Sequence, residues 1–191
     1  MMNTIEVNLD SFPITDEQFY DLCQDNRHLR FERNAKGNLV IMPPIGGETS
    51  NKNAKITQKL GNWTDEDGTG IAFDSSGGFK LPNGADRSPD ASWIPLEKWQ
   101  NLTEKERQRF VPLCPDFVIE LRSKTDSLKS LRDKMKEYIE NGTRLGWLIN
   151  RQDRQVEIYR QGKEVEILDY PQTLSGEDVL LGFVLDLQLI W

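Results

Sequence analysis

One stretch of the sequence, residues 115–149, restricts the fold more than any other. The apolar run from Asp116 to Leu121 begins after Pro115 and has the length of a buried strand. Residues Ser127 to Asn141 then predict an amphipathic helix that stops at Gly142. Its apolar stripe consists of Leu128, Leu131, Met135, Tyr138 and Ile139. A second strand, Leu145 to Ile149, follows, and this strand–helix–strand order indicates an α/β sandwich.

Shorter patterns predict the other elements on either side of this unit. A helix capped by Thr15 and a helix from Glu48 to Asp65 are expected before it, and residues 96–109 read as an exposed helix. The strand pattern predicts two hairpins, His28–Glu32 with Asn38–Met42 and Leu145–Ile149 with Val156–Tyr159. Further short strands are expected at Ile71–Phe73, Phe79–Leu81, Asp90–Ile94 and Val165–Leu168, followed by a strand-like or irregular tail at Leu180–Trp191.

Composition sets the class of protein. The 191 residues suit one domain, with an N-terminal helix and hairpin at about 12–45, a core at about 46–170 and a tail at 171–191. No apolar run approaches the roughly 18 residues of a membrane helix, and no secretory signal is visible, so we expect a cytoplasmic protein. Cys23 and Cys114 fit a reducing compartment, and with His28 as the single histidine they argue against a zinc site.

The formal net charge of −7 disfavours a protein that coats DNA without regard to sequence, because such proteins carry a basic face. It does not exclude a nuclease, whose site concentrates carboxylates around a metal ion. Residues 122–136 form a locally basic stretch that is either a solvated helix face or a contact for a phosphate backbone.

Carboxylates at the ends of two predicted strands are the candidates for a metal-binding catalytic site. Asp90 follows Pro89, and Glu120 ends the buried run Phe117 to Ile119, where a carboxylate is costly unless it is paired or bound to a metal. Two such groups on neighbouring strands could share Mg²⁺, which prefers one or two carboxylates together with water and phosphate. Asp116 is a poorer partner, since four residues of strand separate it from Glu120 by roughly 13 Å.

Four segments resemble the bacterial Uma-type family of putative restriction endonucleases. The resemblance runs from about Phe12 to Trp191, and its most specific blocks are PDFVIEL and KMKEYIENG followed by GWLI. The segments are GGETSNKNAKI, FKLPNGADRSPDASWI, PDFVIELRSKTDSLKSLRDKMKEYIENG and TRLGWLINRQDRQVEIYR. The resemblance implies a restriction-endonuclease-like fold, with a central mixed β-sheet flanked by helices.

The same resemblance implies a function and a set of site residues. It implies a Mg²⁺-dependent endonuclease acting on DNA, with Mn²⁺ able to substitute, that works as a homodimer. Its metal-binding aspartate falls on Asp90, the acidic residue of its (D/E)XK element on Glu120, and its helix glutamate on Glu48.

The basic residue of this element departs from the superfamily pattern. The lysine expected two positions after Glu120 is Arg122, which cannot act as a general base because its pKa exceeds about 12, although it could clamp a phosphate. Lys134 on the following helix is the candidate replacement. It lies one turn before Tyr138, at the edge of the apolar stripe, so its ammonium could reach back toward the strand ends.

Each candidate also has a purely structural interpretation. Asp90 could cap a turn, Glu48 could be a first-turn acid, Lys134 could be solvated, and Arg122 could pair with a neighbouring acid. Two other functions therefore stay open. One is a nucleic-acid- or protein-binding module that keeps the fold without catalysis; the other is a structural or dimerisation protein whose carboxylates only form salt bridges.

Overall fold

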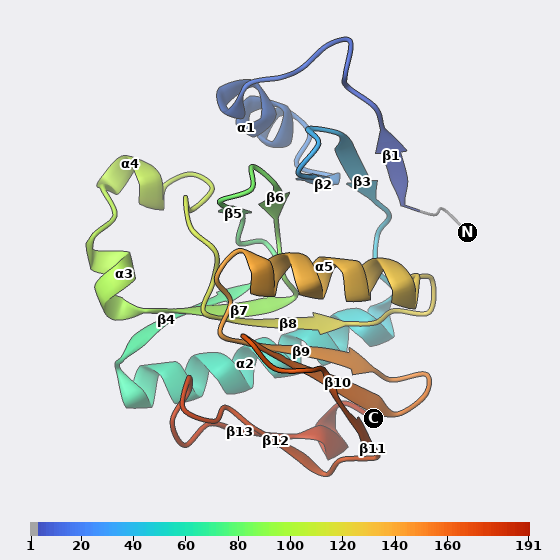
Figure 1. Cartoon of the computed structure of the whole chain (residues 1–191), viewed down its shortest axis with the longest axis vertical. Helices are drawn as coiled ribbons and strands as arrows, with labels where there is room; N and C mark the ends of the chain where they lie inside the picture. The colour runs from blue at the N-terminus through green and yellow to red at the C-terminus, as the bar shows by residue number, and fades with distance from the viewer. Residues whose placement is uncertain (1–3) are drawn as a thin grey trace.

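The computed structural model describes residues 4–191 as a mixed sheet flanked by helices, with an N-terminal layer above it (Figure 1). The central sheet has six strands in the order β11-β10-β9-β8-β7-β4, and only β8 and β9 run parallel among its pairs. Its strands are β4 (Gly70–Asp74), β7 (Ala91–Pro95), β8 (Phe117–Leu121), β9 (Leu145–Asn150), β10 (Gln155–Arg160) and β11 (Glu166–Asp169). The fold class predicted from the sequence is confirmed.

The strand–helix–strand unit forms the centre of the fold. Helix α5 (Leu128–Glu140) begins at Ser127, whose hydroxyl accepts a hydrogen bond from Ser130 N, and it connects the parallel strands β8 and β9. Met135 and Tyr138 are fully buried and pack with Val118 and Leu148 from the sheet. Helix α5 thus covers one face of the sheet over the strand that carries Glu120.

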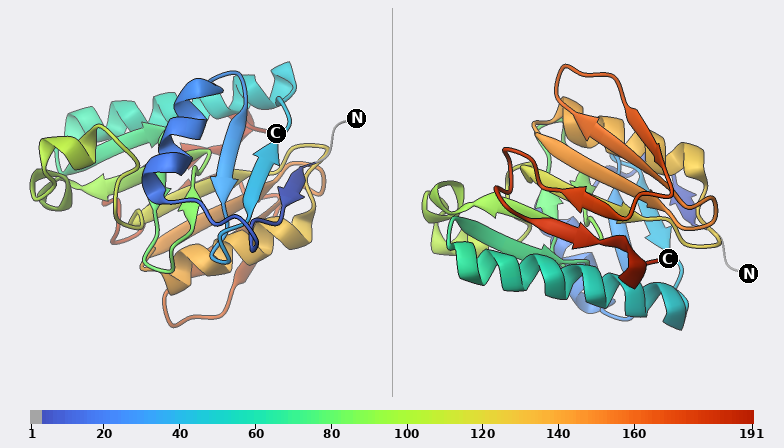
Figure 2. Two further views of the ribbon diagram at one scale, coloured as in Figure 1. Left: turned by 90° about the horizontal axis from the view of Figure 1, so that it is seen from above. Right: turned by 90° about the horizontal axis from the view of Figure 1, so that it is seen from below.

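The opposite face of the sheet packs against helix α2 and the C-terminal segment (Figure 2). Helix α2 (Gly47–Asp67) buries Ile56 and Leu60, and Gly68 ends it in the left-handed conformation (φ 70°) that glycine adopts without strain. The C-terminal segment contains a two-stranded sheet and a 3₁₀ turn, namely β12 (Thr173–Ser175), β13 (Val184–Asp186) and η1 (Leu187–Leu189).

A second, five-stranded sheet forms the N-terminal layer in the order β1-β3-β2-β6-β5. Helix α1 (Asp16–Asp25) begins at Thr15 with a capping box, in which Thr15 and Gln18 each accept a hydrogen bond from the other's backbone N–H. The predicted hairpin is confirmed as β2 and β3. The strands of this sheet are β1 (Ile5–Val7), β2 (Arg30–Arg33), β3 (Leu39–Met42), β5 (Phe79–Lys80) and β6 (Asp86–Arg87).

One helix differs from the sequence-based prediction, and one connection links the two larger sheets. The helix expected over residues 96–109 is two short helices, α3 (Leu96–Gln100) and α4 (Glu104–Arg107), because Thr103 caps a new helix start. Strands β4 and β5, which flank the Ser75–Gly78 turn, belong to different sheets, so the chain crosses there from the central sheet to the N-terminal one. Among residues 4–191, no helix combines the length and apolar character needed to cross a membrane.

Candidate metal and nucleic-acid site

Glu120 is a buried acid on the central strand β8. All five residues of β8 are buried, and the alternation of side chains places Phe117, Ile119 and Leu121 in the core on the α2 side. Val118 and Glu120 consequently face helix α5. Only 5% of the Glu120 side chain is exposed, so its charge depends on the groups that α5 presents to it.

Helix α5 presents two of these groups from consecutive turns. Lys134 Nζ lies 2.8 Å from Glu120 Oε1, and Tyr138 donates its hydroxyl proton to the same oxygen over 3.1 Å. Residues four apart lie on one face of a helix, which explains why both reach one carboxylate. The Lys134 side chain is 13% exposed, so it is a buried partner of Glu120 rather than a solvated lysine.

Lys134 has a second carboxylate partner from the N-terminal sheet. Its Nζ lies 2.8 Å from Glu32 Oε1 on β2, so one ammonium joins an acid from each of the two larger sheets. Glu32 also accepts hydrogen bonds from Ser88 N (3.0 Å) and from Arg87 (3.0 Å). Its side chain is 4% exposed, and these donors satisfy both of its oxygens.

Asp90 is half-buried and lies directly before β7, where it connects three elements. Its Oδ2 accepts a hydrogen bond from Leu121 N at the end of β8 (2.8 Å), and its Oδ1 accepts one from Asn53 Nδ2 of α2 (2.8 Å). These bonds fix the carboxylate at the C-terminal end of the strand that carries Glu120. The structure therefore brings Asp90, Glu120 and Lys134 into one neighbourhood.

The surroundings of these groups shift their pKa values. Burial raises the pKa of Glu120 to about 7, the negative charges of Asp90 and Glu32 act in the same direction, and Lys134 opposes them. Burial also raises the pKa of Asp90. Glu120 is therefore an acid that titrates near neutral pH.

Glu32 and Lys134 shift the other way. Burial would raise the pKa of Glu32, but the positive charges of Lys134 and Arg87 lower it to about 2. Burial would likewise lower the pKa of Lys134, but Glu120 and Glu32 raise it above its ordinary value. Lys134 is thus a permanent cation here, suited to stabilising negative charge and not to accepting a proton.

Two other candidate residues make their contacts elsewhere. Glu48 is exposed in the first turn of α2 and forms an ion pair with Arg151, whose hydrogen bond and charge lower the pKa of Glu48. Arg122 lies just beyond β8 and contacts Asn150 at the end of β9 (3.1 Å) and Asp153 in the β9–β10 turn (3.4 Å). Neither contacts Asp90 or Glu120 in the described part of the chain.

Three residues at the site were not assigned to it from the sequence: Glu32, Asn53 and Tyr138. Asn53 could have been found, because it stands in register with the buried α2 residues Ile56 and Leu60 as a polar residue on an inward face. Tyr138 was assigned only to the apolar stripe, although a buried hydroxyl normally has a partner. Glu32 carries no comparable signal. Its neighbour Phe31 in β2 is buried as well, so this strand shows no alternation that would mark Glu32 as facing inward.

Whether a metal ion fits this site depends on the side-chain oxygens that could bind it. Within residues 4–191, no three His, Cys, Asp or Glu side chains form a ready-made metal cluster. Mg²⁺ needs fewer protein ligands, since one or two carboxylates with water and phosphate suffice. Among the described residues, Glu120 Oε2 receives no hydrogen bond, and Asn53 Oδ1 is buried without a partner beside Asp90. Asp90 and Glu120 therefore fit such an ion.

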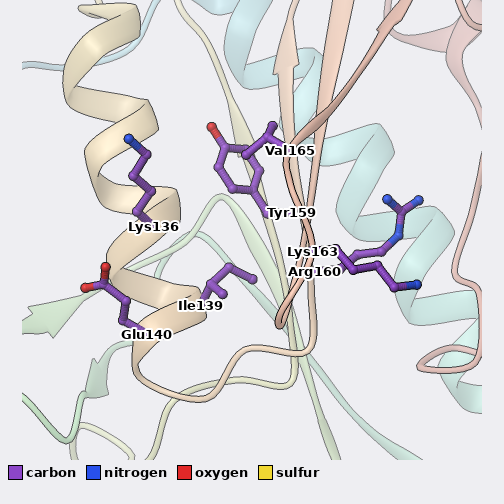
Figure 3. A pocket seen from close by; sticks show the side chains of 7 residues that line it. All are labelled: Lys136, Ile139, Glu140, Tyr159, Arg160, Lys163 and Val165. Carbon is purple, nitrogen blue, oxygen red and sulfur yellow. The ribbon is translucent and has the colours of Figure 1, made fainter.

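Two small cavities elsewhere contain none of these residues. One, of about 130 Å³, lies between α5 and the β10–β11 turn and is lined on the helix side by Lys136, Ile139 and Glu140 (Figure 3). The other, of about 120 Å³, lies between α1 and β5, with Asp16 and Lys80 among its lining residues. A long substrate reaching Asp90 and Glu120 would approach over the surface rather than enter either cavity.

Comparison with known proteins agrees with this fold. A solved structure described as a putative nuclease belonging to DUF820, from Anabaena variabilis ATCC 29413, superposes with a TM-score of 0.75 at 20% identity, covering 93% of this chain and 97% of that chain. No curated protein matches the chain significantly. The Uma2 family profile, described as a putative restriction endonuclease, matches residues 16–188 and confirms the resemblance found in the sequence. The chain belongs to the Uma2 family of putative restriction endonucleases.

Proposed function

We propose that this protein is a Mg²⁺-dependent endonuclease that hydrolyses phosphodiester bonds of DNA at the Asp90–Glu120–Lys134 cluster. Membership of the family supports nuclease activity. One observation carries the finer assignment: Glu120 is a buried acid whose pKa is raised to about 7, next to Asp90 and in contact with the fixed cation of Lys134. Strongly perturbed acids beside a specific charge partner are concentrated at functional sites.

Each residue has a role in this proposal. Asp90 and Glu120 would hold the divalent cation, which supplies Lewis acidity by lowering the pKa of the attacking water and offsetting charge on the phosphate. Lys134 would stabilise the negative charge that develops on the phosphate oxygens. Tyr138 and Glu32 would hold Glu120 and Lys134 in place.

Other parts of the sequence-based assignment stay predictions. Glu48 as a third metal ligand would require its carboxylate to leave Arg151, and Arg122 as a phosphate clamp would require it to leave Asp153. Substitution of Mn²⁺ for Mg²⁺ and assembly as a homodimer are tested by the cleavage assay and by the mass of the protein in solution.

The first prediction concerns cleavage itself. Purified protein is expected to nick or linearise supercoiled plasmid DNA with Mg²⁺ or Mn²⁺ and to leave it intact in EDTA. Asp90→Asn is expected to remove this activity, because asparagine keeps the hydrogen bond from Leu121 N but loses the charge. Agarose gel electrophoresis of a time course measures both results.

Asp116→Asn is the matched control, since Asp116 also follows a proline, is buried, and pairs with Lys98 at 2.7 Å away from the cluster. It is expected to cleave like the wild type. Binding of DNA without cleavage under all metal conditions would favour the inactive binding module. No saturable Mg²⁺ or Mn²⁺ binding by calorimetry would favour the structural role.

The second prediction concerns the pH dependence of metal binding. The pKa of Glu120 is about 7, so below pH 7 the metal must displace a proton from this carboxyl. The Mn²⁺ affinity is therefore expected to fall about tenfold per pH unit below 7 and to level off above pH 8. Calorimetry in two buffers of different ionisation enthalpy should show about one proton released at pH 6 and almost none at pH 8.5.

Glu120→Gln provides the control for this experiment, because the variant has no carboxyl to deprotonate at this position. Its residual Mn²⁺ binding should lack the proton release at pH 6. Metal binding by the wild type that is equally tight at pH 6 and pH 8 would show that the metal displaces no proton from Glu120 and would contradict this prediction.

A further inference from the structure

Four basic side chains gather at the end of the central sheet where the candidate site lies: Lys52, Lys55, Lys124 and Arg151. Their charges act on one another and on Glu48. Arg151 first, and then Lys124 and Lys52, lower the pKa of Glu48, while burial first, and then Lys55 and Arg151, lower the pKa of Lys52. A chain with a net charge of −7 thus carries a local excess of positive charge here.

The topology places this cluster beside the candidate site. Lys52 precedes Asn53, which donates a hydrogen bond to Asp90, and Lys124 lies four residues after Glu120. Arg151 follows β9, whose Ile149 pairs with Leu121 of the parallel strand β8. The first turns of α2 lie at the same end of the sheet as the tips of β8 and β9 (Figure 1).

The geometry of Arg151 suits an oxyanion ligand. Its side chain is 15% exposed; Nε donates to the Ile190 carbonyl over 3.0 Å, and Nη2 contacts Glu48. The fork of a guanidinium binds carboxylate and phosphate in the same way. The Glu48 carboxylate therefore occupies a position on Arg151 that a phosphate oxygen could take.

Other groups around Arg151 also favour an anion. The N-terminus of helix α2, which is the positive end of its dipole, lies beside Arg151 and Glu48. Its N-cap residue, Gly46, supplies no side-chain oxygen to the N–H groups of the first turn. Lys52 Nζ donates to the backbone oxygens of Leu189 (3.1 Å) and Trp191 (3.4 Å), which leaves one of its three N–H groups for a ligand. Lys124 is exposed.

We propose that Lys52, Lys55, Lys124 and Arg151 hold the phosphate backbone of duplex DNA against the candidate site, and that a backbone phosphate displaces Glu48 from Arg151. This proposal rests on the proposed function, since it names the surface by which the same site receives its substrate. It gives Glu48 the role of an acid that competes with DNA and not that of a metal ligand.

The test measures the salt dependence of DNA binding. All proteins carry Glu120→Gln, so that Mg²⁺ can be present without cleavage, and fluorescence anisotropy of a labelled duplex follows binding from 50 to 300 mM salt. Each lost phosphate contact reduces the slope of log K against log salt by about 0.9. Lys52→Gln with Lys124→Gln is therefore expected to reduce the slope by about 1.8 and to weaken binding more than tenfold at 50 mM salt.

The matched control is Lys136→Gln with Lys163→Gln, which removes the same charge from two exposed lysines at the cavity of Figure 3. This variant should keep the wild-type slope. Its affinity for DNA should fall slightly and by the same factor at every salt concentration. An equal reduction of the slope in both double variants would overturn the proposal, because it would show a response to net charge alone.

Glu48→Gln separates the two roles of Glu48. The proposal expects tighter DNA binding in the Glu120→Gln background, because Arg151 no longer has a competing carboxylate. It expects unchanged Mn²⁺ affinity by calorimetry when Glu48→Gln is made in the protein with its natural Glu120. Weaker Mn²⁺ binding with no gain in DNA affinity would overturn the competing role and support the metal-ligand role.

Failure of this proposal is distinguishable from failure of the proposed function. The protein with its natural Glu120 could cleave DNA while the Lys52→Gln, Lys124→Gln double variant keeps the wild-type slope. That result would overturn the proposed DNA-binding surface and leave the proposed nuclease function intact. A reduced slope in a protein that never cleaves DNA would support the surface and overturn the nuclease. No DNA binding at 50 mM salt would overturn both.

Discussion

Replacing Glu120 by glutamine is expected to lower the rate of metal-dependent DNA cleavage by at least about a thousandfold while leaving the fold intact. Glutamine has the shape of glutamate and can still accept the hydrogen bonds of Lys134 and Tyr138. It cannot supply the negative charge that a divalent cation needs, and the charge stabilisation by that cation is worth several kcal/mol, or about a factor of ten for each 1.4 kcal/mol. Single-turnover cleavage of a labelled duplex measures the loss.

Stability provides a second readout for this variant. The raised pKa of Glu120 means that the unfolded carboxyl ionises before the folded one, so the wild type loses stability as the pH rises from about 4.5 to about 7. Glutamine does not titrate, and the variant should therefore lack this loss. At pH 8 we expect its free energy of unfolding to be no lower than that of the wild type.

Glu157→Gln is the matched control for Glu120→Gln. Glu157 is also a buried glutamate of the central sheet; it pairs with Arg132 of α5 (2.7 Å) and accepts a hydrogen bond from the Tyr159 hydroxyl (2.6 Å). Its loss should leave the cleavage rate unchanged. If both variants cleaved DNA at the wild-type rate, Glu120 would have no part in the reaction.

Replacing Lys134 by methionine is expected to lower the free energy of unfolding at pH 8 by about 3–5 kcal/mol, the usual cost of removing one partner from a buried ion pair. Lys134 is the shared partner of Glu32 and Glu120, and both carboxylates are at least 95% buried. The loss should shrink at pH 5, below the pKa of about 7 of Glu120, because that carboxyl is then protonated. Urea denaturation at the two pH values measures the difference.

Lys129→Met on the same helix is the control for Lys134→Met. Lys129 is exposed and, among residues 4–191, pairs with Asp133 alone, four residues along, at 3.6 Å. Such a surface pair contributes about 0.3–0.5 kcal/mol. A similarly small loss in Lys134→Met, at both pH values, would show that Lys134 does not balance the two buried acids.

The sequence predicts much of the central unit, because its signals are local. The stripe from Leu128 to Ile139 and the stop at Gly142 fix α5, and the apolar run to Leu121 fixes β8. The alternation of side chains along β8 also separates Glu120 from the core residues on its other face. The four-residue spacing of Lys134 and Tyr138 then brings both within reach of Glu120.

Local sequence patterns do not predict contacts between distant parts of the chain. Glu32 and Lys134 are 102 positions apart, and Glu48 and Arg151 are 103 positions apart. No periodic pattern relates residues so far apart, since their meeting depends on how the N-terminal sheet and the β9–β10 turn pack. The family resemblance therefore named Glu48 without its partner Arg151, and no pattern in the sequence pointed to Glu32.

The ion pairs of Lys134 have a consequence for how the two sheets are held together. In the proposed site, a cation bound at Glu120 Oε2 would share the charge of this carboxylate with Lys134, so the ammonium would depend more on Glu32, its partner across the boundary between the sheets. Linkage is reciprocal, so whatever metal binding does to the docking of the N-terminal sheet, docking must do equally to metal affinity. If the metal binds as proposed, β2 is therefore expected to influence its affinity through Glu32 and Lys134 without supplying a ligand.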